Sequence, residues 1–176
     1  EKTNEAYAIA KISGIKMCES FNNQYNTDFR SVMPANLYGV NDNYDELNSH
    51  VLAALVRKIL IAKKNNKKVV TIWGNGKAKR EFLHTDDFAK ACIKVMSISK
   101  KKYHKICGAE NQFINIGFGK EITIKDLALT ISQVIDFKGK FYYDKTKPNG
   151  TFRKLTDSSK IKSLNWSPKI SLKDGL

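Results

Sequence analysis

Cysteine and long apolar runs are scarce in this sequence of 176 residues. The three cysteines, Cys18, Cys92 and Cys107, are an odd number without CxxC spacing, which argues against a disulfide framework or a zinc site and favours reduced thiols. No apolar run approaches the ~20 residues that a transmembrane helix needs, and the first residues lack the hydrophobic region of a signal peptide. These absences predict a cytoplasmic protein with no metal site and no membrane partner.

Arginine is also scarce, and this bears on the charge of the chain. The formal net charge is +14, yet only four of the 31 cationic residues are arginines. Arginine, unlike lysine, binds bases and phosphates through two parallel hydrogen bonds. We therefore predict no nucleic-acid partner and a basic cleft for an anionic substrate, with nucleic-acid binding kept as an alternative. The lysine-rich runs at 63–68 and 99–105 are interpreted as a solvated helix end and a loop.

Hydrophobic periodicity predicts alternating helices and strands. Apolar residues recur every four positions from Leu47 to Ile59, whereas KVVTIW and KFYYD are typical of strands. The pair Asn75-Gly76 favours a tight hairpin turn, and Thr85 is expected to cap the following helix. The expected helices cover 7–23, 47–59 and the lysines beyond, 85–96, 123–135 and 157–164; the expected strands cover 27–35, 68–73, 113–117 and 140–144. This alternation predicts an α/β protein.

The segment YAIAK places Tyr7 and Lys11 four residues apart, on one face of the first expected helix. A lysine ammonium close to a tyrosine hydroxyl favours the phenolate form. Such a tyrosine can exchange a proton with a substrate carbonyl or alcohol during hydride transfer. Chance also produces this spacing, so the pair alone leaves open a purely structural role.

A glycine-rich phosphate-binding loop is missing. The glycines of GFGKE at 117–121 lack the GxGxxG spacing and the strand–helix context of that motif. No strand precedes the helix that carries Tyr7. These two absences predict that the chain is the back part of a larger protein.

Several motifs, in order along the chain, resemble those of known enzymes. The stretch from YAIAK to PANLYG resembles the extended short-chain dehydrogenase/reductase superfamily. More narrowly, PANLYG, NSHVLAALVRK, WGNG with REFLHTDD, and KPNGTFRKLTDSSKIKSLNW resemble the GDP-L-fucose synthase family. That family epimerises GDP-4-keto-6-deoxy-mannose at C3 and C5 and reduces it at C4 with NADPH. The resemblance runs from Tyr7 to Leu176.

The resemblance implies roles for the residues of the first two motifs. Tyr7 would protonate the C4 oxygen, and Lys11 would assist it and hydrogen-bond the nicotinamide ribose of NADP(H). The residues that would lie against the nicotinamide end of the cofactor are Pro34, Ala35, Asn36 and Leu37. The alternative for this segment is an ordinary strand end and turn.

His50 stands where the family has a histidine that lies beside the cofactor and, with an upstream cysteine, inverts C3 and C5. Histidine suits this chemistry because it can act as acid or base near neutral pH. The alternative is a polar residue that caps a helix. His84, by contrast, is interpreted as structural, and Asp86 and Asp87 as first-turn residues of a helix.

Four further residues match positions that contact the GDP-sugar in the family: Lys58, Trp73, Arg80 and Asn149. Lys58 replaces an expected arginine and loses its two-pronged hydrogen bonding. Asn149 replaces an expected aspartate, so its contact is expected to differ. Trp73 has the alternative of a core aromatic.

The resemblance also implies a domain organisation. Residues 1–40 would be the C-terminal portion of a Rossmann-type cofactor domain, and residues 41–176 mainly the substrate domain, with 68–100 partly returning to the cofactor domain. The glycine-rich half would be absent, so the chain alone is expected to be inactive, and the whole enzyme is expected to form a homodimer through the YxxxK helix. Two alternatives remain: another nucleotide-sugar epimerase or dehydratase, and a non-catalytic GDP-sugar-binding fragment.

Overall fold

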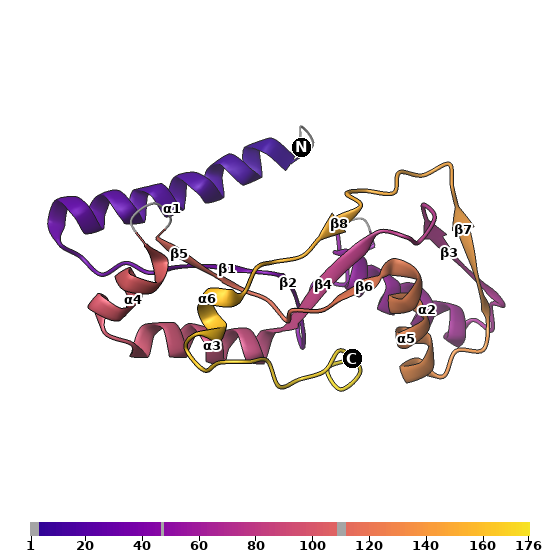
Figure 1. The fold of residues 1–176 in the computed structure, drawn as a ribbon. Coiled ribbons are helices and arrows are strands. Elements are labelled where there is room, and N and C mark those ends of the chain that lie inside the picture. Colours follow the sequence, from indigo (N-terminus) through magenta and orange to yellow (C-terminus); the bar gives the residue numbers. More distant parts are fainter. Residues whose placement is uncertain (1–3, 47, 109–111) are drawn as a thin grey trace.

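The computed structural model describes residues 4–46, 48–108 and 112–176. Helices and strands alternate along this part of the chain, which confirms the predicted α/β class (Figure 1). The helices are α1 (Glu5–Tyr25), α2 (Val51–Lys64), α3 (Thr85–Ser97), α4 (Lys100–Cys107), α5 (Ile124–Ile135) and α6 (Ser159–Lys162). The strands are β1 (Ser31–Pro34), β2 (Asn36–Tyr38), β3 (Val69–Trp73), β4 (Lys79–His84), β5 (Phe113–Ile116), β6 (Glu121–Thr123), β7 (Lys140–Asp144) and β8 (Arg153–Lys154).

Most strand pairs are parallel. β1 pairs with β5, β2 with β4, β3 with β7 and β4 with β8 in parallel, whereas β4 pairs with β6 antiparallel. Figure 1 shows α1 on one side of the β1–β5 pair with α3 and α4 on the other, and α2, α5, β3 and β7 gathered at the opposite end. The N-terminal end of α1 points toward the middle of the molecule.

Two hydrophobic clusters form the interior, and β4 contributes to both. One cluster packs α2 and α5 against β3 and β7, and the other packs α3 and α4 against β1 and β5. Successive residues of a strand point to opposite faces. Phe82 accordingly joins the first cluster and Leu83 the second. β4 therefore connects the two clusters, as does its neighbour β2, which places Tyr38 in the first cluster and Leu37 against the second.

The expected loop at 99–105 is wrong, because these residues form most of α4. The Ser99 hydroxyl caps the helix by accepting a hydrogen bond from the Lys102 N–H at 3.3 Å. Tyr103 and Cys107, one turn apart, are buried, and the Tyr103 hydroxyl donates to the Gln112 carbonyl at 2.8 Å. The lysines lie on the exposed side of a helix that is held by these two residues.

The expected hairpin at Asn75-Gly76 is also wrong. Both Gly74 and Gly76 have the positive φ that favours glycine, at 76° and 71°, so a tight turn is present. The strand that enters it, β3, pairs with β7, whereas the strand that follows, β4, pairs with β2. The turn therefore passes the chain from one sheet to another.

Helix starts differ slightly from the expected ones. α3 is capped by His84, one residue before Thr85: its Nδ1 accepts a hydrogen bond from the Asp86 N–H at 3.2 Å. His84 is buried, which agrees with a structural role. α2 begins at Val51, and Leu47, from which its periodicity was counted, lies outside the described residues.

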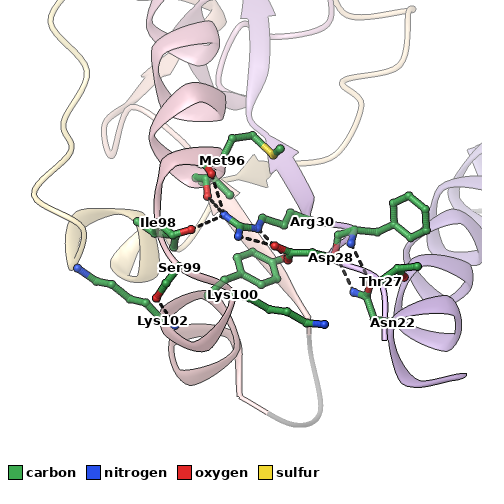
Figure 2. Close-up of polar contacts among 12 residues, drawn as sticks. Asn22, Thr27, Asp28, Arg30, Met96, Ile98, Ser99, Lys100 and Lys102 are labelled. Atoms are coloured by element: carbon green, nitrogen blue, oxygen red, sulfur yellow. Dashed lines mark hydrogen bonds and ion pairs between the residues drawn. The ribbon is translucent and has the colours of Figure 1, made fainter. Parts of the chain in front are cut away.

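The last turn of α1 is joined to β1 by polar contacts (Figure 2). The Asn22 side chain donates to the Phe29 carbonyl and accepts from the Phe29 N–H, both at 2.8 Å. Arg30 Nη1 then donates to the carbonyls of Val95, Met96 and Ile98, at 2.5, 3.1 and 2.9 Å. These carbonyls lie at the C-terminal end of α3, so Arg30 fixes the start of β1 against that helix.

Candidate active site

A cavity of about 820 Å³ lies where α1, the β1–β2 connection, the start of α2 and β4 meet. Seven of the residues singled out in the sequence line it: Tyr7, Pro34, Ala35, Asn36, Leu37, His50 and Arg80. These residues span more than seventy positions of the chain, so the fold brings them together. Lys58, Trp73 and Asn149 form a second group that is described below.

Tyr7 and Lys11 lie on the exposed side of α1. Lys11 Nζ is 5.4 Å from the centroid of the Tyr7 ring, which is the proximity that their four-residue spacing predicts. Tyr7 is 62% exposed and reaches the cavity from the N-terminal end of the helix. Lys11 is not among the described residues that line the cavity, so it approaches the cavity only through its position beside the Tyr7 ring.

The segment 34–37, which lines the cavity, is held in place by hydrogen bonds to two neighbouring strands. The Ala35 N–H donates to the Ile116 carbonyl at 2.9 Å, which extends the pairing of β1 with β5. The Asn36 side chain donates to the Glu81 carbonyl at 2.8 Å, which attaches β2 to β4. Because both contacts are made to neighbouring strands, this segment presents a rigid edge to the cavity.

His50 occupies the N-cap position of α2 through its backbone, with its carbonyl accepting from the Ala54 N–H at 2.9 Å. Its side chain makes no capping hydrogen bond to any described residue. The imidazole is exposed and lines the cavity. The capping alternative for this side chain is therefore wrong, and the imidazole is available to a ligand.

Arg80 connects the cavity to the segment that follows β7. Its Nη1 donates to the carbonyls of Lys79 and Thr151, each at 2.7 Å. Beside it, Glu121 accepts from both Lys79 Nζ, at 2.9 Å, and Arg153 Nε, at 2.6 Å. These two cations hold the pKa of the Glu121 carboxyl below its usual value, chiefly through the Arg153 hydrogen bond. Lys79 and Arg153 are thus paired with Glu121, and Arg80 and Lys154 are, among the described residues, the arginine and the lysine that line the cavity.

Glu81, which the sequence analysis did not single out, is the most buried charged residue at the cavity. It is 0% exposed, and its two carboxylate oxygens accept from the N–H groups of Gly119, at 2.5 Å, and Thr156, at 2.9 Å. A Cβ on Gly117 would lie 2.5 Å from Glu81 Oε1, so the chain passes the carboxylate more closely than another residue would allow. The sequence carries no local signal for this role, because Gly119 and Thr156 are 38 and 75 residues away from Glu81.

The second group surrounds Trp73, at the end of β3. Trp73 is 61% exposed, so its interpretation as a core aromatic is wrong. Lys58 Nζ lies 5.3 Å from the centroid of the indole. Asn149 Oδ1 accepts from the Asn75 N–H at 2.7 Å, in the turn that follows Trp73. Lys58 also lines a separate hollow of about 290 Å³ between α2 and β3.

Within residues 4–46, 48–108 and 112–176 there is no group of three or more histidine, cysteine, aspartate or glutamate side chains suited to a metal ion. In the same ranges, no helix has both the length and the apolar character to cross a bilayer.

Comparison with known proteins identifies the family. The sequence model of the NAD dependent epimerase/dehydratase family matches residues 1–117. The chain belongs to this family. Its parallel strands and covering helices are those of the family's solved members, including a GDP-L-fucose synthetase from Naegleria fowleri with NADP bound, at 26% identity and a TM-score of 0.84. That comparison covers 99% of this chain and 55% of the Naegleria chain.

Within this epimerase/dehydratase family, the resemblance to GDP-L-fucose synthases is confirmed. The chain is 54% identical to a protein of Arabidopsis thaliana named putative GDP-L-fucose synthase 2, and 48% identical to GDP-L-fucose synthase of Escherichia coli K12. Both matches cover the whole chain, but 51% and 55% of the relatives. A GDP-6-OMe-4-keto-L-xylo-heptose reductase from C. jejuni matches at 37% identity with a TM-score of 0.88, over 98% of this chain and 58% of that one. The chain thus spans about half the length of the curated relatives it matches.

Proposed function

We propose that the full-length protein converts GDP-4-keto-6-deoxy-D-mannose into GDP-L-fucose, by epimerisation at C3 and C5 followed by NADPH-dependent reduction at C4. The observation that carries this proposal is the convergence of Tyr7, His50 and the segment 34–37 on one cavity. The names of the relatives, which include GDP-L-fucose synthases from a plant and a bacterium, support the same substrate.

The residues at the cavity suit a nicotinamide cofactor. In open parallel sheets, ligands bind beyond the carboxyl ends of the strands. Residues 34–37 leave the carboxyl end of β1 and line the cavity at that point. Bound NADPH would supply the hydride for reduction at C4. Pro34, Ala35, Asn36 and Leu37 would line its nicotinamide end, and Lys11 would hydrogen-bond its ribose.

In this proposal Tyr7 donates the proton that the C4 oxygen needs as the carbonyl becomes an alcohol. The phenolate that remains is negatively charged, and the Lys11 ammonium stabilises it by attraction at short range. The proton is replaced from solvent, to which Tyr7 is open. Tyr7 and Lys11 therefore work as one proton-transfer unit.

His50 would exchange protons at C3 and C5. Both carbons are α to the C4 carbonyl, which makes their protons removable by a side-chain base. Inversion needs one group on each face of the sugar, so His50 requires a second acid or base opposite it. Of the described residues, Cys18, Cys92 and Cys107 do not line the cavity, so we assign that second role to none of them.

The proposal is tested by NADPH oxidation with GDP-4-keto-6-deoxy-D-mannose, using the full-length protein. Tyr7→Phe removes the proton donor and is expected to lower kcat by at least about 100-fold, the usual contribution of a positioned acid. The matched control is Tyr25→Phe, an equally exposed tyrosine at the other end of α1, which should leave kcat unchanged. Equal rates for Tyr7→Phe and wild type would contradict the proposal.

A second candidate is a GDP-sugar 4-keto reductase without epimerase activity, and the C. jejuni reductase with its TM-score of 0.88 favours it. The two candidates differ at His50. In deuterium oxide, an epimerase incorporates deuterium at C3 and C5, and His50→Gln should abolish this incorporation. His104→Gln, in α4, is the control. Turnover without deuterium at either carbon would favour the second candidate.

We also propose the domain division and the dimer that the resemblance implies. Residues 1–40 would belong to the cofactor domain and residues 41–176 mainly to the substrate domain. Large apolar side chains on α1 support a helix-mediated homodimer, since Ile9, Ile12 and Met17 are each more than half exposed. In analytical ultracentrifugation, the Ile12→Lys variant should sediment as a monomer. The control variant, Lys16→Ala, should remain a dimer.

A further inference from the structure

The buried carboxylate of Glu81 is held by backbone groups and not by a cation. Among the described residues, no lysine, arginine or histidine side chain forms an ion pair with it. A carboxylate that is removed from water needs hydrogen bonds in place of its lost hydration. Glu81 receives them from the Gly119 N–H at Oε1 and from the Thr156 N–H at Oε2, at 2.5 and 2.9 Å. Because both donors belong to the backbone, the carboxylate fixes the path of the chain at two places.

The bond to Thr156 continues a very short strand pairing. β8 pairs with β4 through two residues, Arg153 and Lys154. Just before β8, the Phe152 carbonyl accepts from the backbone of β4 at 2.8 Å. Just after β8, the Thr156 N–H attaches the chain to Glu81. Lys154 and Thr156 both line the cavity, so the Glu81 carboxylate holds the segment that forms this wall of it.

The backbone of Glu81 contacts a different wall of the cavity. Its carbonyl accepts from the Asn36 side chain at 2.8 Å, and Asn36 belongs to the segment proposed to lie against the nicotinamide end of the cofactor. A substitution of the Glu81 side chain leaves this carbonyl in place. The two walls therefore depend on separate parts of one residue: the wall of Lys154 and Thr156 on the carboxylate, and the wall of Asn36 on the carbonyl.

We propose that Glu81 is a positioning residue for the GDP-sugar, whose carboxylate holds the wall formed by Lys154 and Thr156 in the place where the sugar nucleotide binds. The inference rests on the proposed function and adds to it a residue that touches neither substrate nor cofactor. Arg80, which lies opposite Lys154 in the pairing of β4 with β8, supports the assignment of this wall to the GDP-sugar, since the family resemblance gives Arg80 that contact. Binding of NADPH, by contrast, depends on the wall that the carboxylate does not hold.

Asp87 offers a matched comparison within the same part of the protein. It is 1% exposed, and its Oδ2 accepts from the N–H groups of Lys169 and Ile170, at 2.7 and 2.8 Å. Neither Lys169 nor Ile170 belongs to the lining of the cavity within the described ranges. Asp87 and Glu81 thus make the same kind of contact to the C-terminal part of the chain, and only the contact of Glu81 reaches the cavity.

The test is steady-state kinetics of the full-length protein carrying Glu81→Gln, with the GDP-sugar and NADPH varied in turn. The amide keeps the size of the side chain, but its nitrogen cannot accept a hydrogen bond. We expect the KM for GDP-4-keto-6-deoxy-D-mannose to rise by about fivefold, the scale of one lost hydrogen bond, and the KM for NADPH to change by less than about twofold. Glu81→Met, which offers no acceptor to either N–H, should raise the KM for the sugar further; if this variant does not fold, the Gln variant decides.

The control is Asp87→Asn, which should lower the Tm as Glu81→Gln does and leave both KM values unchanged. A general loss of stability would not separate the two substrates in this way. An unchanged KM for the sugar in Glu81→Gln, equal rises in both KM values, or the same rise in Asp87→Asn would each overturn the inference.

The outcome is separable from that of the proposed function. If the wild type does not turn over the 4-keto sugar, the proposed reaction is refuted, and calorimetric titration with GDP and with NADPH replaces the kinetics. A GDP affinity that falls in Glu81→Gln, with an unchanged NADPH affinity, would then leave the positioning role standing. Turnover with the same sugar KM in wild type and Glu81→Gln would support the reaction and overturn the role of Glu81.

Discussion

Glu81 joins three chain segments around the cavity through one carboxylate and one carbonyl. The carboxylate accepts from Gly119 and Thr156, and the carbonyl accepts from the Asn36 side chain. Two backbone N–H groups thus depend on a single buried side chain for their partners. A buried N–H that loses its acceptor costs about 1–3 kcal/mol.

Replacing Glu81 by Ala should therefore lower the free energy of unfolding by about 2–6 kcal/mol, since two N–H groups lose their acceptor. Urea denaturation followed by circular dichroism measures this change. Glu46→Ala is the control because Glu46 belongs to an exposed pair with Arg57, and its effect should stay below about 1 kcal/mol. Similar losses for the two variants would contradict the role given to Glu81.

Individual residues could be predicted from the sequence where they belong to a motif, and less well where their role depends only on tertiary packing. Tyr7, His50 and Arg80 line the expected cavity. Glu81 was missed because its partners, Gly119 and Thr156, are 38 and 75 residues away, and no local pattern links them. The sequence also did not indicate whether Trp73 is buried or exposed, since an aromatic residue at a strand end suits either environment.

Among the elements, the β1 strand depends on a cationic side chain at the end of a helix. Arg30 binds three carbonyls at the C-terminal end of α3 and the Asp28 carboxylate, with Nη2 2.7 Å from Asp28 Oδ2. A positive charge is favourable at a helix C-terminus, where carbonyls lack partners. The Arg30 guanidinium lowers the pKa of Asp28 through its hydrogen bond to that carboxylate.

Arg30→Lys should destabilise the protein by about 1–3 kcal/mol at neutral pH, because an ammonium cannot satisfy all these acceptors. The Asp28 contribution is present above the pKa of an unfolded aspartate and is lost as the pH falls through the lowered folded pKa. The stability gap between wild type and variant should therefore narrow on acidification. Unfolding curves from pH 7 to pH 3 measure it, with Arg57→Lys as control; a constant gap would argue against the Asp28 contact.

Element types were predictable where the apolar spacing was regular, as in α2 and α5. The helix α4 was missed because five of its eight residues are lysine or histidine, and Tyr103 and Cys107 are its two buried residues. The Asn75-Gly76 turn was predicted correctly as a turn, but the two strands that it connects do not pair with each other as a hairpin would. Strand pairing depends on tertiary packing, and three helices and three strands of chain lie between β3 and its parallel partner β7.

At the scale of the whole molecule, the net charge of +14 creates a field that attracts anions. The cavity, which Arg80 and Lys154 line, lies in this field, and the proposed substrate carries a diphosphate. Association that is steered by charge weakens with salt, because the screening length falls from about 10 Å at 0.1 M to about 3 Å at 1 M ionic strength.

We therefore expect kcat/KM for the GDP-sugar to fall as sodium chloride is raised from 0.05 to 0.5 M, in the range of about 3- to 10-fold, with kcat nearly unchanged. The Tm at each salt concentration shows whether salt also changes the stability of the protein. Tight, salt-sensitive binding of DNA or RNA in place of this effect would instead support the nucleic-acid alternative.

The attachment of α1 has one further consequence. Of its described residues, Asn22 is the buried one, so the helix is held near its end and Tyr7 lies fifteen residues away. At 1.5 Å per residue this is a lever arm of about 22 Å, and a tilt of about 3° at the fixed end moves Tyr7 by about 1 Å. A displacement of that size can cost a catalytic group about 100-fold in rate. In the proposed homodimer, the partner surface packed along α1 would therefore fix the position of Tyr7, so that assembly and catalytic rate would depend on each other.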